Sequence, residues 1–370
     1  MLGTTCKVLM CKRILASQTN SDCGVPFYKI GTIGGVPDAY ISKELFESYR
    51  AKYNYPRKGE VMITCAGTVG KAMIFDGHDS YYQDSNIVWI DNPTNTIDNT
   101  FLYHFISKVD WSKLNTTTIV RIYNDDLRQL WISYPTLSEQ RKISIFLNLL
   151  NQRIETQKKI IERYESLIRG IVKTHYSQCE SIKEARISEL GKAFTTMNMS
   201  KEDLSEDGNE CILYGELFTT YGCVIKDVKS KTNISTDRAT KSRNNDLLFP
   251  ASTTVDAMSL IAPTAIYKEG VILGGDLFGI HVNEDYNNEY LSYLINYIYK
   301  STLARYAQGS TIIHLHYSDI KNVTLLLPSI EDQNYLAHLM RSIEAKINIE
   351  KDMLSELYRQ KAYLLSNLFI

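Results

Sequence analysis

The sequence predicts an α/β protein with a pseudo-twofold internal repeat, in which two similar mixed α/β domains are separated by two long helices that form an antiparallel coiled coil. Three observations predict this fold class. A short motif that ends in Pro-x-x-x-x-Gln occurs in both halves, β-rich runs broken by glycine turns precede each copy, and a long segment with apolar residues spaced alternately three and four apart follows each copy. A duplicated unit of domain plus helix therefore describes the chain better than a single domain.

The first domain is predicted over residues 1–135. Strands are expected at 61–64, 72–75 and 87–90, and a short helix at 101–107, because β-branched and aromatic runs alternate there with glycine breakers. The segment 65–72 is only superficially similar to a phosphate-binding loop, since Cys65 stands where that loop needs its first glycine. A tight turn between strands is the better interpretation.

The first long helix is predicted over residues 136–178. It follows Pro135 and opens with the capping-box pattern Thr136-x-x-Glu139, in which the first side chain can accept a hydrogen bond from a free backbone N–H. Its apolar seam, expected to face the other helix, comprises Leu147, Leu150, Ile154, Ile161, Tyr164 and Ile168.

The second domain, residues 179–327, repeats this order. Strands are expected at 246–249, 265–267 and 278–281, followed by a short helix at 290–299. The second long helix, residues 328–370, has a seam at matching positions: Met340, Ile343, Ile347, Leu354, Leu357 and Leu364. Each helix could instead pack only on its own domain, but so narrow and regular a stripe favours another helix as the partner.

The composition limits the classes of protein to which the chain can belong. The 44% of hydrophobic and 22% of charged residues are ordinary for a globular protein, and the N-terminus lacks the core of a signal peptide, so the sequence predicts a cytoplasmic protein. The seven cysteines show no zinc-ligand spacing and are expected to be reduced thiols. The 41 basic and 42 acidic residues nearly cancel, whereas nucleic-acid binders usually carry a basic excess. If the chain binds DNA, partner proteins are expected to help.

Neither a catalytic constellation nor a metal site is predicted. No nucleophile, base and oxyanion donor can be assembled from the sequence. His314 and His316 lie two apart on an expected strand, so both would face one side and could bind a metal. No carboxylate or cysteine lies near them in the sequence to complete the ligand shell.

A series of motifs connects the chain to a known family: Tyr28–Thr32, Lys58–Val61, Gly67–Gly70, Tyr82–Asn86 and Leu137–Gln140, with Gln308–Thr311 before the second copy of the repeated motif. In this order, and over essentially the whole chain, the sequence resembles the DNA specificity subunits of Type I restriction-modification systems. The first half departs from the pattern, because residues 115–118 stand where the second half has Gln308–Thr311.

The resemblance implies two target recognition domains, each of which reads one half of a bipartite site in double-stranded DNA. It implies that the two helices set the spacer between the half-sites and dock DNA-adenine modification (methyltransferase) subunits, and that ATP-dependent restriction subunits, which translocate and cut, complete the assembly. The chain itself would be non-catalytic and without a cofactor. S-adenosylmethionine is expected in the modification partner.

The candidate DNA-binding residues are polar, aromatic or cationic side chains in predicted loops, which can contact phosphates or base edges. In the first domain they are Lys29, Lys52, Arg57, Lys71, Gln83, Asn86, Thr117 and Arg121. In the second domain they are Tyr221, Lys229, Lys231, Arg243, Thr253, Thr254, Gln308 and Ser310.

Two other functions agree with the sequence. A coiled-coil scaffold that joins proteins without touching DNA would explain the near-neutral charge. A recognition module of a fused methyltransferase-nuclease would require a catalytic domain in the same reading frame. Sequence preference in a gel-shift experiment separates a DNA reader from a scaffold.

Overall fold

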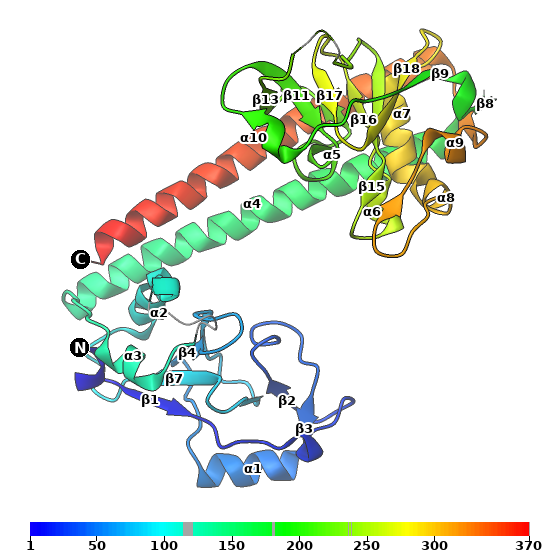
Figure 1. Ribbon diagram of the computed structural model, residues 1–370. Coiled ribbons are helices and arrows are strands. Elements are labelled where there is room, and N and C mark those ends of the chain that lie inside the picture. Colours follow the sequence, from blue (N-terminus) through cyan, green and yellow to red (C-terminus); the bar gives the residue numbers. More distant parts are fainter. Residues whose placement is uncertain (114–120, 180–181, 236, 238, 370) are drawn as a thin grey trace. The chain divides into compact units, whose positions relative to one another are not determined.

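The computed structural model describes residues 1–113, 121–179, 182–235, 237 and 239–369. The chain divides into two compact units, which are described separately here. The first comprises Met1–Lys158 and Asp352–Ile370, and the second comprises Lys159–Lys351. Each unit therefore contains one α/β domain together with part of both long helices, α4 (Leu137–Gln178) and α10 (Ile330–Leu368), which Figure 1 draws in green and red.

The first unit is built on a four-stranded antiparallel sheet in the order β1-β7-β4-β5. These strands are β1 (Lys7–Met10), β4 (Val61–Thr64), β5 (Ala72–Ile74) and β7 (Ile87–Asp91). A second sheet has the order β3-β2-β6 and comprises β2 (Val25–Tyr28), β3 (Tyr40–Ile41) and β6 (Tyr81–Tyr82). The helices of this domain are α1 (Lys43–Lys52), α2 (Asn99–Lys108) and α3 (Asn124–Gln129).

The turn between β4 and β5 shows why the glycines there are required. Gly70 has a φ of +84°, and a Cβ atom at this position would lie 2.1 Å from Cδ1 of Trp111. A side chain could not fit without moving this indole, whose ring is nearly fully buried. The prediction of a tight turn at residues 65–72 is confirmed.

The second unit contains a five-stranded sheet in the order β12-β16-β14-β18-β9. Its strands are β9 (Gly191–Thr195), β12 (Val224–Ile225), β14 (Asp246–Pro250), β16 (Thr264–Ile266) and β18 (Leu277–Val282). A four-stranded sheet, β10-β13-β11-β17, comprises β10 (Leu204–Ser205), β11 (Asn209–Leu213), β13 (Ser230–Thr232) and β17 (Ile272–Gly274). Two strand pairs complete the strands of the unit: β15 (Ser252–Thr253) with β19 (Ile313–His314), and β8 (Lys183–Arg186) with β20 (Thr324–Leu327).

Short helices connect these strands. They are α5 (Glu216–Thr219), α6 (Ala257–Leu260), α7 (Asn288–Leu294), α8 (Lys300–Ala304) and α9 (Tyr317–Ile320), and a π-helical turn, Ile295–Tyr299, joins α7 to α8. The strands predicted from β-branched runs and the short helix before each long one are all present. The predicted fold class, two mixed α/β domains with two long helices, is confirmed.

The two long helices run antiparallel, as contacts within each unit show. In the first unit the ammonium group of Lys158 lies 5.7 Å from the centre of the Tyr358 ring, and Leu147, earlier in α4, shares a hydrophobic core with Leu364, later in α10. In the second unit Nζ of Lys351 lies 3.5 Å from the Glu165 carboxylate. Because positions later in α4 contact positions earlier in α10, the helices point in opposite directions.

The residues of the predicted seam lie on the covered side of each helix. Leu147, Ile154, Ile161, Ile168, Met340 and Ile347 are buried. Leu150, Tyr164, Ile343, Leu354, Leu357 and Leu364 are half-buried. In the first unit, Leu147 and Leu364 belong to the same hydrophobic core as Val61 and Phe101, so this end of the helix pair also covers the domain's sheet and α2.

The duplicated Pro-x-x-x-x-Gln motif explains how each long helix is joined to its domain. The buried amide of Gln140 accepts a hydrogen bond from the backbone N–H of Asp98, which caps α2, at 2.7 Å, and donates to the carbonyl of Pro135 at 2.9 Å. Gln333 repeats both bonds, accepting from Asn287 at 3.0 Å and donating to Pro328 at 2.9 Å. One glutamine thus ties the long helix to the start of the short helix in both units.

Replacing either glutamine with alanine should destabilise its own unit. Gln140→Ala and Gln333→Ala each remove two hydrogen bonds between a buried side-chain amide and the backbone, which should lower the free energy of unfolding by about 1–3 kcal/mol. Urea denaturation followed by circular dichroism measures the change. Gln152→Ala, at an exposed position of α4, is the matched control and should stay within about 0.5 kcal/mol of the parent. Equal stability of Gln140→Ala and Gln152→Ala would contradict this assignment.

Candidate nucleic-acid interface

In each domain, two equivalent backbone hydrogen bonds join three chain segments, and we call this arrangement the corner of the domain. In the first, the N–H of Cys65 donates to the carbonyl of Asn86 at 2.8 Å, and the N–H of Ile122 donates to the carbonyl of Cys65 at 2.9 Å. In the second, Ala251 donates to Asp276 at 2.8 Å, and Leu315 donates to Ala251 at 2.9 Å. Three segments that are distant in the sequence therefore meet in the same arrangement twice.

In the first domain this corner opens into a cavity of about 400 Å³. Its walls include the cationic side chains of Arg13, Lys29 and Arg121 and the carboxylate of Asp84. Its other lining residues are Ile14, Leu15, Ala16, Thr19, Phe27, Gln83, Ser85 and Asn86. The cavity thus combines an excess of positive charge with hydrogen-bonding groups and an apolar wall.

Local contacts orient the polar groups of the cavity. The Nε atom of Arg13 lies 3.7 Å from the Asp84 carboxylate, and Nη2 of Arg121 donates to Oγ of Ser85 at 3.3 Å. Oε1 of Gln83 accepts from the backbone N–H of Ile30 at 3.4 Å. These bonds orient the side chains of Arg13, Arg121 and Gln83 in the wall of the cavity. The Arg121 side chain is partly exposed.

The cavity brings together four of the eight candidate residues of the first domain: Lys29, Gln83, Asn86 and Arg121. Lys71 is exposed on the nearby β4–β5 turn, where its ammonium donates to the carbonyl of Ile33 at 2.6 Å. Lys52 is exposed at the end of α1, and Thr117 lies outside the described residues.

Sequence reasoning missed Arg13, Asp84 and Ser85 as members of this site. Asp84 has no basic partner near it in the sequence, because Arg13, with which it pairs, is far away along the chain. The nearest signal in the sequence is the basic pair Lys12 and Arg13.

Two candidate arginines occupy equivalent positions away from the two corners. The N–H of Arg57 donates to the Glu60 carboxylate at 2.7 Å, and that of Arg243 donates to the Asp246 carboxylate at 2.8 Å. The Arg57 guanidinium also pairs with Glu60 and Asp91, at the opposite end of β7 from Asn86. These contacts give the Arg57 side chain a structural role, whereas Arg243 contributes its backbone N–H to the equivalent turn.

The two buried acids have raised pKa values. Burial raises the pKa of Glu60 despite its hydrogen bonds from Arg57. Burial likewise raises the pKa of Asp246, whose carboxylate accepts from Arg243 and lies 2.6 Å from Nδ1 of His281. In both domains a buried carboxylate therefore closes the turn that leads into the central strand.

In the second domain four candidates gather near the corner. Thr253 pairs with Ile313 across β15 and β19, Thr254 follows it, and the backbone groups of Gln308 and His314 exchange two hydrogen bonds of 2.9 and 2.7 Å. Ser310 is exposed in the turn between them. These residues lie beside the corner of the second domain, next in sequence or in strand pairing to Ala251 and Leu315.

The other candidates of the second domain lie elsewhere. The Tyr221 hydroxyl accepts a hydrogen bond from the N–H of Lys229 at 3.0 Å, and Lys231 follows on β13, in the four-stranded sheet. Burial raises the pKa of Tyr221 to about 12, so its hydroxyl is protonated at neutral pH. These three side chains form a separate group from Thr253 and Gln308.

The sequence suggests His314 only as a possible metal ligand. The structure instead places its ring beside a carboxylate. Its Nδ1 lies 3.7 Å from the carboxylate of Asp276, an acid from the neighbouring strand connection. His316 caps α9 and lies outside β19, so the prediction that both histidines share one strand is wrong for His316. Across the residues described, no cluster of three or more His, Cys, Asp or Glu side chains could hold a metal ion.

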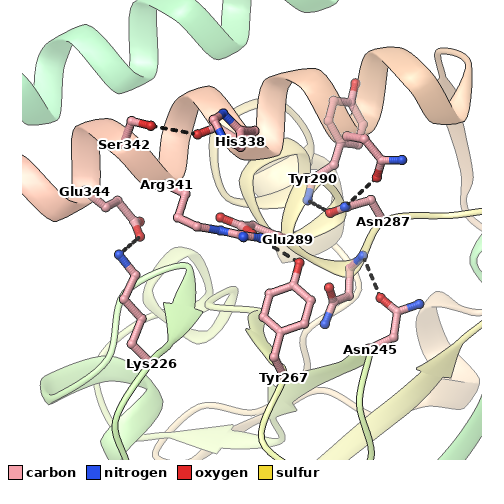
Figure 2. A network of polar contacts seen from close by, with 12 residues as sticks. Lys226, Asn245, Tyr267, Asn287, Glu289, Tyr290, His338, Arg341, Ser342 and Glu344 are labelled. Carbon is pink, nitrogen blue, oxygen red and sulfur yellow. Dashed lines mark hydrogen bonds and ion pairs between the residues drawn. The ribbon is translucent and has the colours of Figure 1, made fainter.

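The second domain is attached to α10 by a polar network (Figure 2). The guanidinium of Arg341 donates to the buried carboxylate of Glu289 at 2.7 Å, and the Tyr267 hydroxyl donates to the same oxygen at 3.1 Å. One turn further along α10, Glu344 lies 3.9 Å from the ammonium of Lys226, and burial raises the pKa of this carboxyl. In the first unit Asn148 of α4, at the position that corresponds to Arg341, forms a hydrogen bond with His104 at 3.0 Å.

Comparison with known proteins agrees with the repeat. A family model described as the Type I restriction modification DNA specificity domain matches residues 2–165 and again residues 180–359. A type I restriction enzyme specificity subunit of Haemophilus influenzae is 52% identical over 147 residues. This match covers 40% of the present chain and 38% of that relative, so the aligned part spans well under half of the relative's length.

Two solved structures share the fold. The S subunit of a Type-I restriction-modification system from M. genitalium has a TM-score of 0.61 and 15% identity, over 100% of this chain and 95% of that one. A chain from a study of complex assembly and conformational transition in the type I R-M system has a TM-score of 0.58 and 16% identity, over 99% and 95% of the two chains. At such low identity these likenesses show the architecture alone. Of the helices in the described parts of the chain, none is both long enough and apolar enough to cross a membrane.

Proposed function

Because this chain belongs to the family of Type I restriction-modification DNA specificity domains, we propose that it is the non-catalytic, sequence-specific DNA-recognition subunit of such a complex. Each domain reads one half of a bipartite target in double-stranded DNA. The long helices set the spacer between the two half-sites and dock the modification subunits. Restriction subunits complete the assembly.

The observation that carries this proposal is the corner that is built twice with the same hydrogen bonds. Reading a sequence requires donors and acceptors at base edges, and phosphate contacts position them. The first corner offers both kinds of group, since Lys29 can neutralise a phosphate while Gln83, Asn86 and Arg121 can bond to bases. Two such corners in one chain suit a target made of two separate half-sites.

The long helices support the second part of the proposal. At 42 residues, α4 is about 63 Å long at 1.5 Å per residue, which far exceeds what either small domain needs for its own packing. Large apolar side chains remain exposed on both helices, among them Ile145 and Phe146 on α4 and Ile349 on α10. Such residues on a helix surface are suited to protein partners.

The net charge of this chain and the cofactor expected in its partners agree with a chain that selects the sequence while other subunits carry out the chemistry. The net charge of −1 indicates that the chain does not hold DNA by general electrostatic attraction alone, so the modification subunits contribute to affinity. S-adenosylmethionine is expected in those subunits, and this chain supplies orientation and sequence selection.

A gel-shift experiment with the full chain and its modification subunits tests the proposal. Methylation-sensitive sequencing of DNA from a host that carries the complex first identifies the target, and a duplex with that target should bind more tightly than one with scrambled half-sites. Equal affinity for both duplexes would favour a protein scaffold and overturn the proposed function.

Exchanging one domain should change one half-site alone. When residues 1–135 are replaced by the corresponding domain of a family member with a known target, methylation should move to a hybrid target in which the second half-site and the spacer are unchanged. The reason is that each domain has its own core and its own corner. A change in both half-sites after this exchange would show that the domains do not read independently.

A further inference from the structure

Arg121 and His314 occupy the same position in the two domains. Each is the residue directly before the one whose N–H closes the corner, Ile122 in the first domain and Leu315 in the second. They also precede the duplicated Pro-x-x-x-x-Gln motif by the same number of residues, Arg121 before Gln140 and His314 before Gln333, although one side chain is a guanidinium and the other an imidazole. The hydrogen-bond pattern of the two corners confirms this equivalence.

Both side chains reach toward the same neighbouring loop, the one that precedes β7 in the first domain and β18 in the second. Arg121 donates to Ser85 at 3.3 Å, and Nδ1 of His314 lies 3.7 Å from Asp276. The His316 ring stacks beside His314 with the ring centres 6.1 Å apart. Each side chain is therefore oriented by a polar partner and still partly exposed.

We propose that Arg121 and His314 are the equivalent base-reading residues of the two recognition domains, an inference that rests on the proposed function. Each corner also contains a carboxylate, Asp84 beside Arg13 and Asp276 beside His314. A carboxylate repels a phosphate but can accept a hydrogen bond from the amino group of cytosine, so these corners suit base edges better than the DNA backbone.

The chemistry of the two residues predicts different preferences. The planar fork of Arg121 matches O6 and N7 of guanine, the commonest specific contact of arginine in the major groove. The ring of His314 offers single donor and acceptor positions and selects a base by one bond, together with neighbours such as Thr253. The first half-site is thus expected to contain a guanine that depends on Arg121.

The test selects bound sequences from a pool of randomised duplex DNA, using the full chain with its modification subunits. Arg121→Ala should reduce the preference at one base pair of one half-site by about tenfold to a hundredfold and leave the other half-site unchanged. His314→Ala should do the same in the other half-site. Arg121→Lys keeps the positive charge but lacks the planar guanidinium with its paired donors, and should lose the same base preference.

Arg128→Ala is the matched control, because it removes an exposed guanidinium of the same domain that pairs with Asp125 on the surface of α3. It should leave all preferences unchanged. If an alanine variant fails to fold, Arg121→Lys and His314→Gln provide the same readout. A uniform loss of affinity across all sequences, or no change, would overturn the base-reading assignment and leave the proposed function in place. Absence of any sequence preference in the parent protein would instead overturn the proposed function.

Discussion

Lengthening both long helices by four residues should abolish binding to the original target and create binding to a target with a longer spacer. Four residues add about 6 Å of helix, which approaches two base pairs at about 3.4 Å each. The half-site sequences should stay the same, because neither corner is altered. Competition between duplexes that differ only in spacer length measures the result.

The antiparallel contacts show where to insert. Lys158 of α4 faces Tyr358 of α10, so insertions after Lys158 and after Leu357 lie opposite each other. Four residues make little more than one helical turn and keep the seam residues on the same face. Two-residue insertions at the same points rotate the seam away from its partner and should destabilise the protein. An unchanged preferred spacer after the four-residue insertions would contradict the idea that the helices act as a ruler.

The second large effect is expected from Arg341→Ala, which leaves the fully buried carboxylate of Glu289 without its cationic partner (Figure 2). Among the described residues, Oε1 of Glu289 has no hydrogen-bond partner, so the other oxygen and its bonds to Arg341 and Tyr267 stabilise the charge. Removing one partner of a buried ion pair commonly costs several kcal/mol. Because the Arg341 side chain is half exposed, we expect a smaller loss of about 2–3 kcal/mol in the free energy of unfolding.

Urea denaturation of the full chain measures this loss, and a second substitution tests its cause. Adding Glu289→Gln to Arg341→Ala removes the buried charge and should restore at least half of the lost stability. Arg359→Ala breaks an exposed pair with Glu356 on the same helix and should change stability by less than about 0.5 kcal/mol. If Arg341→Ala is as stable as Arg359→Ala, the network in Figure 2 does not hold the second domain to α10.

The helices and the repeat could be predicted because their signals are local. Thr136 and Glu139 form the predicted bonds at the start of α4, and Ser329 and Asp332 form equivalent bonds at the start of α10. Each long helix begins one residue after its capping side chain. The seam spacing is likewise a property of neighbouring turns. In contrast, α1 was not predicted, because it buries only Phe46 and most of its residues are polar or charged.

The candidate site was predicted only in part, since residue type does not tell which loops meet. Lys29, Gln83, Asn86 and Arg121 share one cavity, whereas Arg57, of similar chemistry, is bound to Glu60 and Asp91 at the other end of the sheet. His314 has no acid close to it in the sequence. Its partner Asp276 is brought near by the strand register of the second domain.

The sequence by itself determined the internal repeat, the two long helices and the family, because capping, periodicity and motif order depend on residues that lie close together in the sequence. Only the tertiary structure decided that Arg13 lies against Asp84 and that Asp276 lies beside His314. These relations depend on which strands pair and in which register, and pairing is set by the burial of whole sheets rather than by the residues that it brings together.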